Sequence, residues 1–345
     1  MSSSEAFPKR DDVATTPLIE ASAAYPALEN AMLDARTEAL LGFRVLSPRT
    51  KLRTDRARSQ GLDTWCDLVA NTVARGVRVR ILMTDFEPVM ANGLHQRTWK
   101  DMTGFCAAVP SDAKGDLQVI AALHEGEFGL VTRWLLWPLV WSKLQGLHAE
   151  ATTRSQKGAE NLRQRSPGLW RALTRKGKAF QINGWPPPRM WPVTYHQKLA
   201  VFDGEATILG GLDIDERRFD DPDHEKPSDQ TWHDVSIQSA GPIAYDLRQH
   251  FQNVWNREVP RFNARLTHLG APRDDLPASV TRLPDTEHTA PTHAHAGDIG
   301  TLQVLRTRSR RSRSPFAVGP KAVVTEIETA HVDQIGAATD LIYLE

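Results

Sequence analysis

Residues 191–213 read WPVTYHQKLAVFDGEATILGGLD, and this stretch decides the fold. The run 196–202 is rich in residues that favour β-strands, and a second run of this kind ends at Leu209. The pair Asp203-Gly204 stands between the two runs, where an Asp-Gly pair is a strong short-range signal for a tight hairpin. The stretch therefore predicts a strand, a turn and a second strand.

The hairpin gathers residue types that suit phosphate chemistry. Side chains alternate between the faces of a strand, so His196 and Lys198 should share one face. A neutral imidazole can attack phosphorus, and an ammonium group can hold the phosphoryl oxygens as negative charge shifts. Asp203 falls at the turn with the opposite parity, so we expect it to brace the hairpin through nearby backbone amides. Gly210 and Gly211 have no side chains, so their backbone can approach a phosphate closely.

Together these residues form the pattern H-x-K-x4-D-x6-G-G, which resembles the signature of the phospholipase D superfamily. The resemblance extends over about residues 25–345. LLGFRVLSP at 40–48 and VRVRILMTDFEP at 77–88 look like the opening of the amino-terminal half of bacterial phospholipase D-like proteins. The passage from GGLDIDERRFD to WHDVSIQSAGP is similar to the segment after the first motif in that family.

The resemblance implies a reaction and a set of site residues. One histidine attacks phosphorus to give a phosphohistidine, and the histidine of a second motif protonates the departing alcohol. An acidic residue at the position of Asp234 orients the nucleophile by accepting its Nδ1 proton, whereas we expect the neighbouring His233 to be structural. The implied catalytic residues are His196, Lys198, Asp203 and Asp234, and the implied substrate-binding residues are Gly210 and Gly211. The implied mechanism uses no metal and no cofactor, and the implied substrate is a phospholipid that is hydrolysed or transferred to another alcohol.

Hydrophobic periodicity predicts α/β architecture outside the motif. Apolar residues at helical spacing follow Pro26, a strand-like run follows at 40–46, and a second helical pattern ends at Gly76. The alternating run at 77–83 then completes a strand, helix and strand, which predicts a parallel crossover. The family fold implied by the resemblance is a mixed sheet flanked by helices, repeated in two similar halves.

We expect four segments along the chain. Residues 1–24 are small and polar and are predicted to be disordered. One complete half should span 25–257 and carry the motif, and a linker rich in proline and histidine should span 258–300. Residues 301–345 resemble the first helix and strand of a second half that is truncated before its own motif.

The 345 residues contain a single H-x-K-x4-D pattern, and this is the largest departure from the family. We therefore expect little activity from a monomer, and a homodimer or a missing second half would have to supply the acid. Three alternatives stay open. The motif also serves nucleases and cardiolipin-synthase-like phosphatidyltransferases, and the chain could instead be a non-catalytic lipid-binding remnant.

Charge and hydropathy restrict the partners. Forty-two basic and 42 acidic residues cancel, so no global field favours nucleic acid. The amino terminus shows no apolar signal-peptide core, and no apolar run approaches the ~18 residues of a spanning helix. We expect a cytoplasmic protein for which secretion would need a non-classical route, and peripheral contact with a membrane stays open.

Residues 128–146 place Trp134, Trp137 and Trp141 at spacings of three and four. One interpretation is an interfacial element among lipid headgroups, because tryptophan combines an apolar body with a polar N–H. The other is a helix packed on the sheet and bent at Pro138, and we favour this second interpretation.

Overall fold

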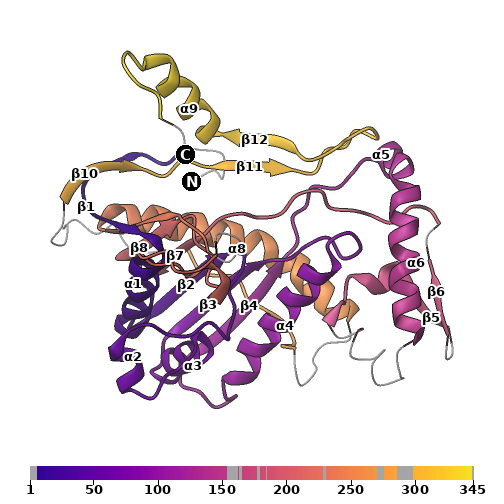
Figure 1. Ribbon diagram of the computed structural model, residues 1–345, viewed down its shortest axis with the longest axis horizontal. Helices are drawn as coiled ribbons and strands as arrows, with labels where there is room; N and C mark the ends of the chain where they lie inside the picture. Colours follow the sequence, from indigo (N-terminus) through magenta and orange to yellow (C-terminus); the bar gives the residue numbers. More distant parts are fainter. Residues whose placement is uncertain are drawn as a thin grey trace.

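The computed structural model describes residues 6–153, 162, 165–176, 179–183, 185–227, 231–269, 276–285 and 298–343. Its centre is a mixed sheet with the strand order β10-β1-β9-β8-β7-β2-β3-β4 (Figure 1). The strands of this sheet are β1 (Lys9–Ile19), β2 (Glu38–Phe43), β3 (Arg78–Thr84), β4 (Asp116–Ala122), β7 (Leu199–Phe202), β8 (Ala206–Gly210), β9 (Val235–Ala240) and β10 (Asp298–Gln303). The predicted mixed α/β fold is confirmed.

Strands β2, β3 and β4 are parallel, whereas the remaining neighbours pair antiparallel. Every residue of β2 is buried, and so is every residue of β3 after Arg78. Such continuous burial is typical of parallel strands that are covered on both faces. The predicted crossover from β2 through a helix to β3 is therefore present.

Helices cover both faces of the sheet (Figure 1). On one face lie α1 (Glu20–Asp34), α2 (Asp55–Ser59), α3 (Trp65–Ala74) and α4 (Asn92–Ala108), and on the other lies α8 (Pro242–His268). Their apolar stripes meet the sheet in one core whose largest fully buried side chains include Trp65, Trp99 and Trp255. Within the described ranges, none of the helices has the combined length and apolar character needed to cross a bilayer.

Local sequence signals explain where these helices begin. Thr64 caps α3 by accepting a hydrogen bond from the Asp67 backbone N–H, and the Asp67 carboxylate bonds back to Thr64 N–H. Gly241 precedes α8 at a φ of 99°, a conformation that glycine adopts without strain, and Pro242 then occupies the first turn.

A smaller unit stands beside the sheet and contains α5 (Leu130–Leu135), α6 (Trp137–Thr153), β5 (Leu173–Lys176) and β6 (Ala179–Ile182) (Figure 1). The buried face of α6 packs on β6 and forms a cluster separate from the main core. The expectation that this segment packs on the main sheet is therefore wrong. Short elements complete the fold: the 3-10 turns η1 (Leu169–Arg171) and η2 (Glu216–Arg218), the hairpin β11 (Thr307–Arg310) and β12 (Lys321–Thr325), and α9 (Glu326–Ala337).

Two segment predictions need correction. Residues 9–24 are not disordered, because 9–19 form strand β1 between β9 and β10 and helix α1 follows directly. The polar composition of 9–19 does not indicate a strand. This segment is ordered because its backbone forms hydrogen bonds with β9 on one side and β10 on the other. The linker prediction for 258–300 is also wrong for 258–268, which continue α8, and for the buried side chains between Leu276 and Leu283. The rest of the predicted linker, 270–275 and 286–297, lies outside the described residues.

The boundary predicted at residue 300 falls inside β10, which pairs with β1 and so extends the first sheet. The helix predicted near the carboxyl terminus is present as α9, and none of its residues is buried. Whether residues 301–345 begin a second half stays a prediction.

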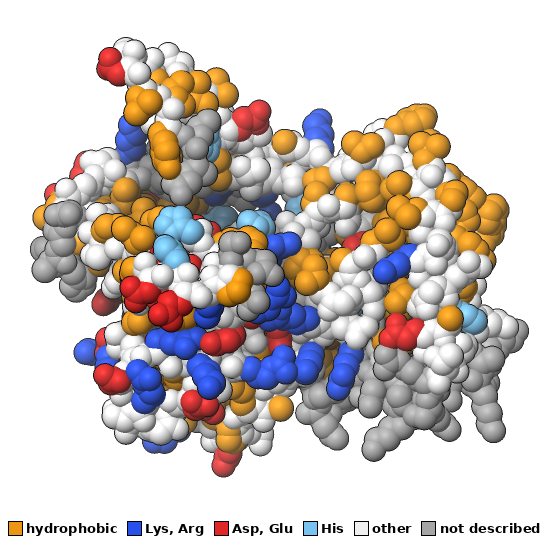
Figure 2. Space-filling view, in the orientation of Figure 1, with side chains coloured by type: hydrophobic (Ala, Val, Ile, Leu, Met, Phe, Trp, Pro, Cys, Tyr) orange, Lys and Arg blue, Asp and Glu red, His pale blue; other side chains and the backbone are white. Residues whose placement is uncertain are grey.

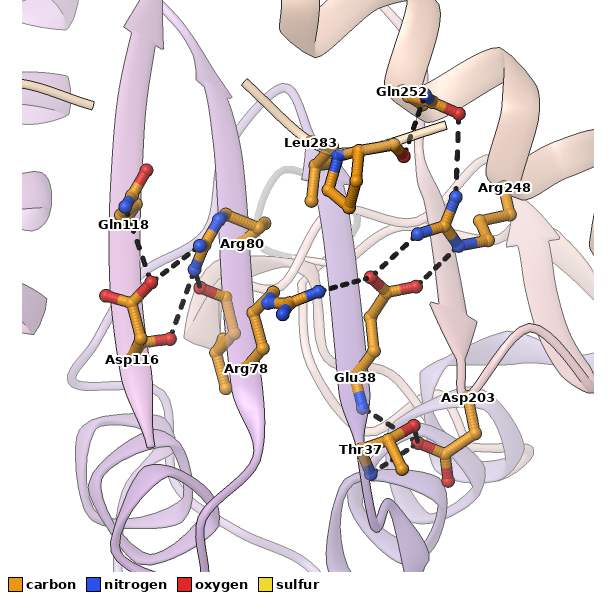
Figure 3. Close-up of polar contacts among 12 residues, drawn as sticks. Thr37, Glu38, Arg78, Arg80, Asp116, Gln118, Asp203, Arg248, Gln252 and Leu283 are labelled. Carbon is orange, nitrogen blue, oxygen red and sulfur yellow. Dashed lines mark hydrogen bonds and ion pairs between the residues drawn. The ribbon is translucent and has the colours of Figure 1, made fainter. Parts of the chain in front are cut away.

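The predicted hairpin is present, with Asp203 at a φ of 53° and Gly204 at 72°. Two consecutive residues at positive φ make the tight turn that matches the twist of paired strands. Asp203 accepts hydrogen bonds of 2.8–2.9 Å from the backbone N–H groups of Arg36, Thr37 and Glu38. Figure 3 shows the bonds from Thr37 and Glu38. The amides therefore belong to the start of the neighbouring strand β2 and not to the hairpin itself.

Asp203→Asn should destabilise the fold by about 2 kcal/mol near neutral pH, because an amide replaces the charged acceptor of these donors. Burial raises the pKa of Asp203, but the bonds from Glu38, Thr37 and Arg36 outweigh it and leave the pKa lowered. The contribution of Asp203 is therefore present above its unfolded pKa and lost as pH falls through the folded value.

Urea unfolding at neutral and acidic pH measures this difference. Asp112→Asn is the matched control, since Asp112 is exposed in a loop, and it should leave stability unchanged. Equal stability of Asp203→Asn and wild type at neutral pH would contradict the bracing role.

Candidate active site

The motif residues lie at the edge of the sheet where β2 ends and β7 begins. Leu199 of β7 pairs with Gly42 of β2, so the residues before Leu199 lie beside those that follow β2. The hydrogen bond from Gly210 N–H to Lys198 O brings the end of β8 to the same edge. Three segments distant in sequence therefore meet here.

His196 and Lys198 are brought together as expected. The Lys198 Nζ atom lies 3.3 Å from His196 Nδ1 and 3.5 Å from Nε2. Both residues precede β7, because the strand begins at Leu199 and not at His196 as predicted. Lys198 is buried and His196 is exposed, so the ammonium group lies beneath an imidazole that solvent can reach.

Positive charge dominates around the pair. Burial lowers the pKa of His196, and the charges of Lys198 and Arg44 lower it further against a smaller opposing effect of Asp213. Burial also lowers the pKa of Lys198, and Asp213 is the main charge that opposes this. Arg218 adds a further positive group, which lowers both pKa values. The imidazole is therefore kept neutral near pH 7 in surroundings that attract an anion.

Asp213 is a site residue that the sequence analysis missed. It is buried, and its Oδ1 accepts a 2.9 Å hydrogen bond from Val45 N–H. Its Oδ2 is buried without a hydrogen-bond partner in the described part of the chain, and Arg218 Nη2 lies 3.9 Å from it. The only sequence signal that could have indicated Asp213 was its position two residues after Gly211.

Asp234 directly precedes β9, the strand that pairs with β8. Its Oδ1 accepts a 2.9 Å hydrogen bond from Val235 N–H, and its carbonyl accepts one from Glu20 N–H. Among the described residues, no hydrogen bond joins Asp234 to His196, so its orienting role stays a prediction. His233 places Nδ1 2.9 Å from Glu20 Oε1, which ties β9 to the start of α1.

The glycine pair is explained by close packing against β9. A Cβ atom on Gly211 would lie 2.0 Å from Asp234 Oδ1, and one on Gly210 would lie 2.0 Å from Ser236 Oγ. Both distances are far below van der Waals contact, so no larger residue fits without movement. Packing against β9 thus accounts for the two glycines, and a phosphate contact of the glycine backbone stays a prediction.

Asp203 is remote from this chemistry. It lies at the opposite end of β7, five residues beyond Lys198, and a strand of that length spans ~17 Å. It therefore acts on the site only by holding β7 against β2.

A second histidine–carboxylate pair near this edge is fully engaged. His95 Nδ1 lies 2.6 Å from Asp85 Oδ1, while His95 Nε2 accepts a hydrogen bond from Gly168 N–H. Asp85 also pairs with Arg265, and although burial raises its pKa, the charges of His95 and Arg265 bring it down to about 2. Both ring nitrogens are occupied, so this pair is structural. Within the described ranges, no group of three or more His, Cys, Asp or Glu side chains is arranged to hold a metal ion.

Comparison with known proteins identifies plant relatives. Phospholipase D beta 2 of Arabidopsis thaliana is 26% identical over 199 residues, which cover 44% of this chain and 21% of that protein. Phospholipase D delta of the same plant is 26% identical over 216 residues, covering 44% of this chain and 25% of the relative. The chain thus matches about a fifth to a quarter of the length of these curated relatives. No family model matches it.

Solved structures that match the chain have low TM-scores and little sequence identity. NucT from Helicobacter pylori superposes with a TM-score of 0.34 and 9% identity, covering 70% of this chain and 96% of that one. Nuc from Salmonella typhimurium, a phospholipase D family member, superposes with a TM-score of 0.33 and 10% identity. The match covers 72% of this chain and 95% of that one.

The His196 imidazole should titrate below its ordinary pKa of 6.5. Lys198→Met should raise that pKa, because removing a neighbouring cation relieves the penalty on the imidazolium form. Histidine ring signals followed by NMR against pH measure both values. Lys226→Met, which removes a lysine from the loop near Phe219, is the control and should not shift His196. An unchanged His196 titration in Lys198→Met would contradict the coupling.

Gly211→Ala should destabilise the protein by about 1–3 kcal/mol, since the new methyl group meets the Asp234 carboxylate. In an Asp234→Ala background most of that cost should vanish. Urea unfolding of the four variants in the cycle measures the coupling. Gly146→Ala serves as control, because nothing lies within 4 Å of its Cβ position. An equal cost in both backgrounds would show that Gly211 is needed for another reason.

Proposed function

Because this chain belongs to the phospholipase D superfamily, we propose that it cleaves phosphodiesters with His196 as nucleophile and a phospholipid as substrate. The observation that carries the proposal is the contact between the exposed His196 ring and the buried Lys198 ammonium group. The names of the plant relatives support the choice of a phospholipid.

The proposed reaction begins with the neutral imidazole. One ring nitrogen of His196 forms a bond to phosphorus while the ester P–O bond breaks, and the alcohol leaves with the electron pair. The positive groups of Lys198, Arg44 and Arg218 stabilise the negative charge that gathers on the phosphoryl oxygens. Water or another alcohol then breaks the N–P bond, which gives hydrolysis or transfer.

The departing alkoxide needs a proton, and general acid help is typically worth about 10²- to 10⁴-fold. In the family mechanism a second motif histidine donates it, and the present sequence holds one such motif. We propose that a second copy of the chain or a second half supplies this histidine. A monomer of these 345 residues should therefore turn over unactivated phosphodiesters poorly.

Two carboxylates are candidates for orienting His196. Asp234 has the position implied by the family resemblance. The negative charge of Asp213 raises the pKa values of both His196 and Lys198. We propose Asp234 as the orienting carboxylate and Asp213 as the group that holds Lys198 charged and in place.

A 4-nitrophenyl phosphodiester tests the nucleophile without the missing acid, because nitrophenolate leaves without protonation. Wild type should rapidly release about one equivalent of nitrophenolate per chain and retain the phosphoryl group on His196. The attack on phosphorus needs only the nucleophile and the surrounding positive groups. The released phenolate is followed by absorbance, and the modified residue is mapped by mass spectrometry under alkaline conditions. His196→Ala should abolish both signals.

His331→Ala is the matched control, since His331 is an exposed histidine on α9, and it should behave as wild type. Asp234→Asn should slow phosphoryl transfer by orders of magnitude without unfolding the protein, as expected when a tautomer is lost. Phosphorylation confined to other histidines, or an undiminished burst in His196→Ala, would refute the proposal.

A further inference from the structure

The small unit beside the sheet carries a group of exposed apolar side chains over α5, the start of α6 and the adjoining loop (Figures 1 and 2). Leu135 is 76% exposed and Trp185 is 74% exposed. Large exposed apolar groups of this kind mark interaction sites, because a folded chain ordinarily buries them. We call this surface the tryptophan patch, and it consists of Leu130, Trp134, Leu135, Leu139, Trp141 and Trp185.

Ring contacts hold the patch in a fixed shape. Trp134 meets Trp185 edge-on at 4.6 Å between ring centroids, and Trp141 lies 5.2 Å from Trp137 in the same measure. Between α6 and Trp185 runs an open groove of about 450 Å³, lined chiefly by tryptophan, proline and isoleucine side chains. The surface is therefore preorganised, and its tryptophans offer apolar rings with N–H groups at the rim.

The segment that carries most of the patch has charges of one sign. Residues 128–149 include Arg133 and Lys143 but no aspartate or glutamate, and the Lys143 side chain is exposed. The nearby acid Glu127 is already paired with Arg189 and Arg311. A twofold contact between two copies would therefore bring the two Lys143 side chains together without offering them a new acidic partner. A negatively charged surface is complementary to the patch instead.

We propose that the tryptophan patch docks this protein onto the surface of an anionic phospholipid bilayer. Leu135 and Leu139 enter the acyl boundary, the tryptophans lie at headgroup level, and Lys143 faces the lipid phosphates. The inference rests on the proposed function and deepens it, because a phospholipid substrate is presented in a bilayer.

The test measures binding to vesicles in a His196→Ala background, so that cleavage plays no part. Cosedimentation with vesicles of phosphatidylcholine mixed with phosphatidylglycerol should retain the protein. The double variant Leu135→Ser/Leu139→Ser should lower the partition coefficient at least tenfold, because two exposed leucines no longer enter the apolar layer. Lys143→Glu should weaken binding to the mixed vesicles several-fold and leave binding to pure phosphatidylcholine unchanged.

The matched control is Val332→Ser/Ile335→Ser, which removes two exposed apolar side chains from α9 and should bind as the parent does. Failure of the parent to bind, or equal binding by the leucine double variant, would overturn the inference. So would a change in oligomeric state confined to that variant on size-exclusion chromatography, which would assign the patch to a second copy. The nitrophenolate burst in free solution is independent of this surface, so either proposal can fail alone.

Discussion

The carboxylate of Asp203 holds the start of β2 against the turn between β7 and β8, and the geometry of the site depends on this contact. Three backbone N–H groups converge on one side chain, so β7 has one favourable register against β2. A slip of one residue would turn every side chain of β7 to the opposite face. The clamp lies at one end of the strand and the chemistry at the other, and the rigid strand transmits the alignment. Around the clamp, Arg248 bonds Glu38 at 2.7 Å and joins α8 to the same strand (Figure 3).

The site collects positive charge without an equal number of carboxylates. Lys198 and Arg44 lie close enough to lower the pKa of His196, and Asp213 is the carboxylate that opposes them most directly. Groups of like charge in partly buried surroundings repel one another, and a bound phosphodiester would relieve that repulsion. Burial, together with the same repulsion, keeps the imidazole unprotonated. The neighbouring cations therefore contribute both to anion binding and to nucleophile activation.

The long sheet unites segments that differ greatly in composition. The parallel strands β2 and β3 are buried almost throughout, because helices cover both of their faces. Strand β1 is polar, yet it pairs on one side with β9 and on the other with β10, so its backbone contributes as much as its side chains. Strand β10 reaches the same sheet from beyond residue 297. The amino-terminal and carboxyl-terminal parts of the chain thus complete one sheet that the central residues begin.

The sequence by itself determined the local features: the tight turn at Asp203-Gly204, the closeness of His196 and Lys198, and the strand, helix and strand that form the parallel crossover. Each depends on residues a few positions apart, whose preferences are legible in the order of the chain. Only the tertiary structure decided which residues of different strands come into contact across the sheet. The partners of Asp203, the packing of Asp234 against Gly211, the place of Asp213 and the pairing of β1 all join residues brought together by strand order. The exposure of Trp185 beside Trp134 is of the same kind, because burial depends on the whole fold and not on local pattern.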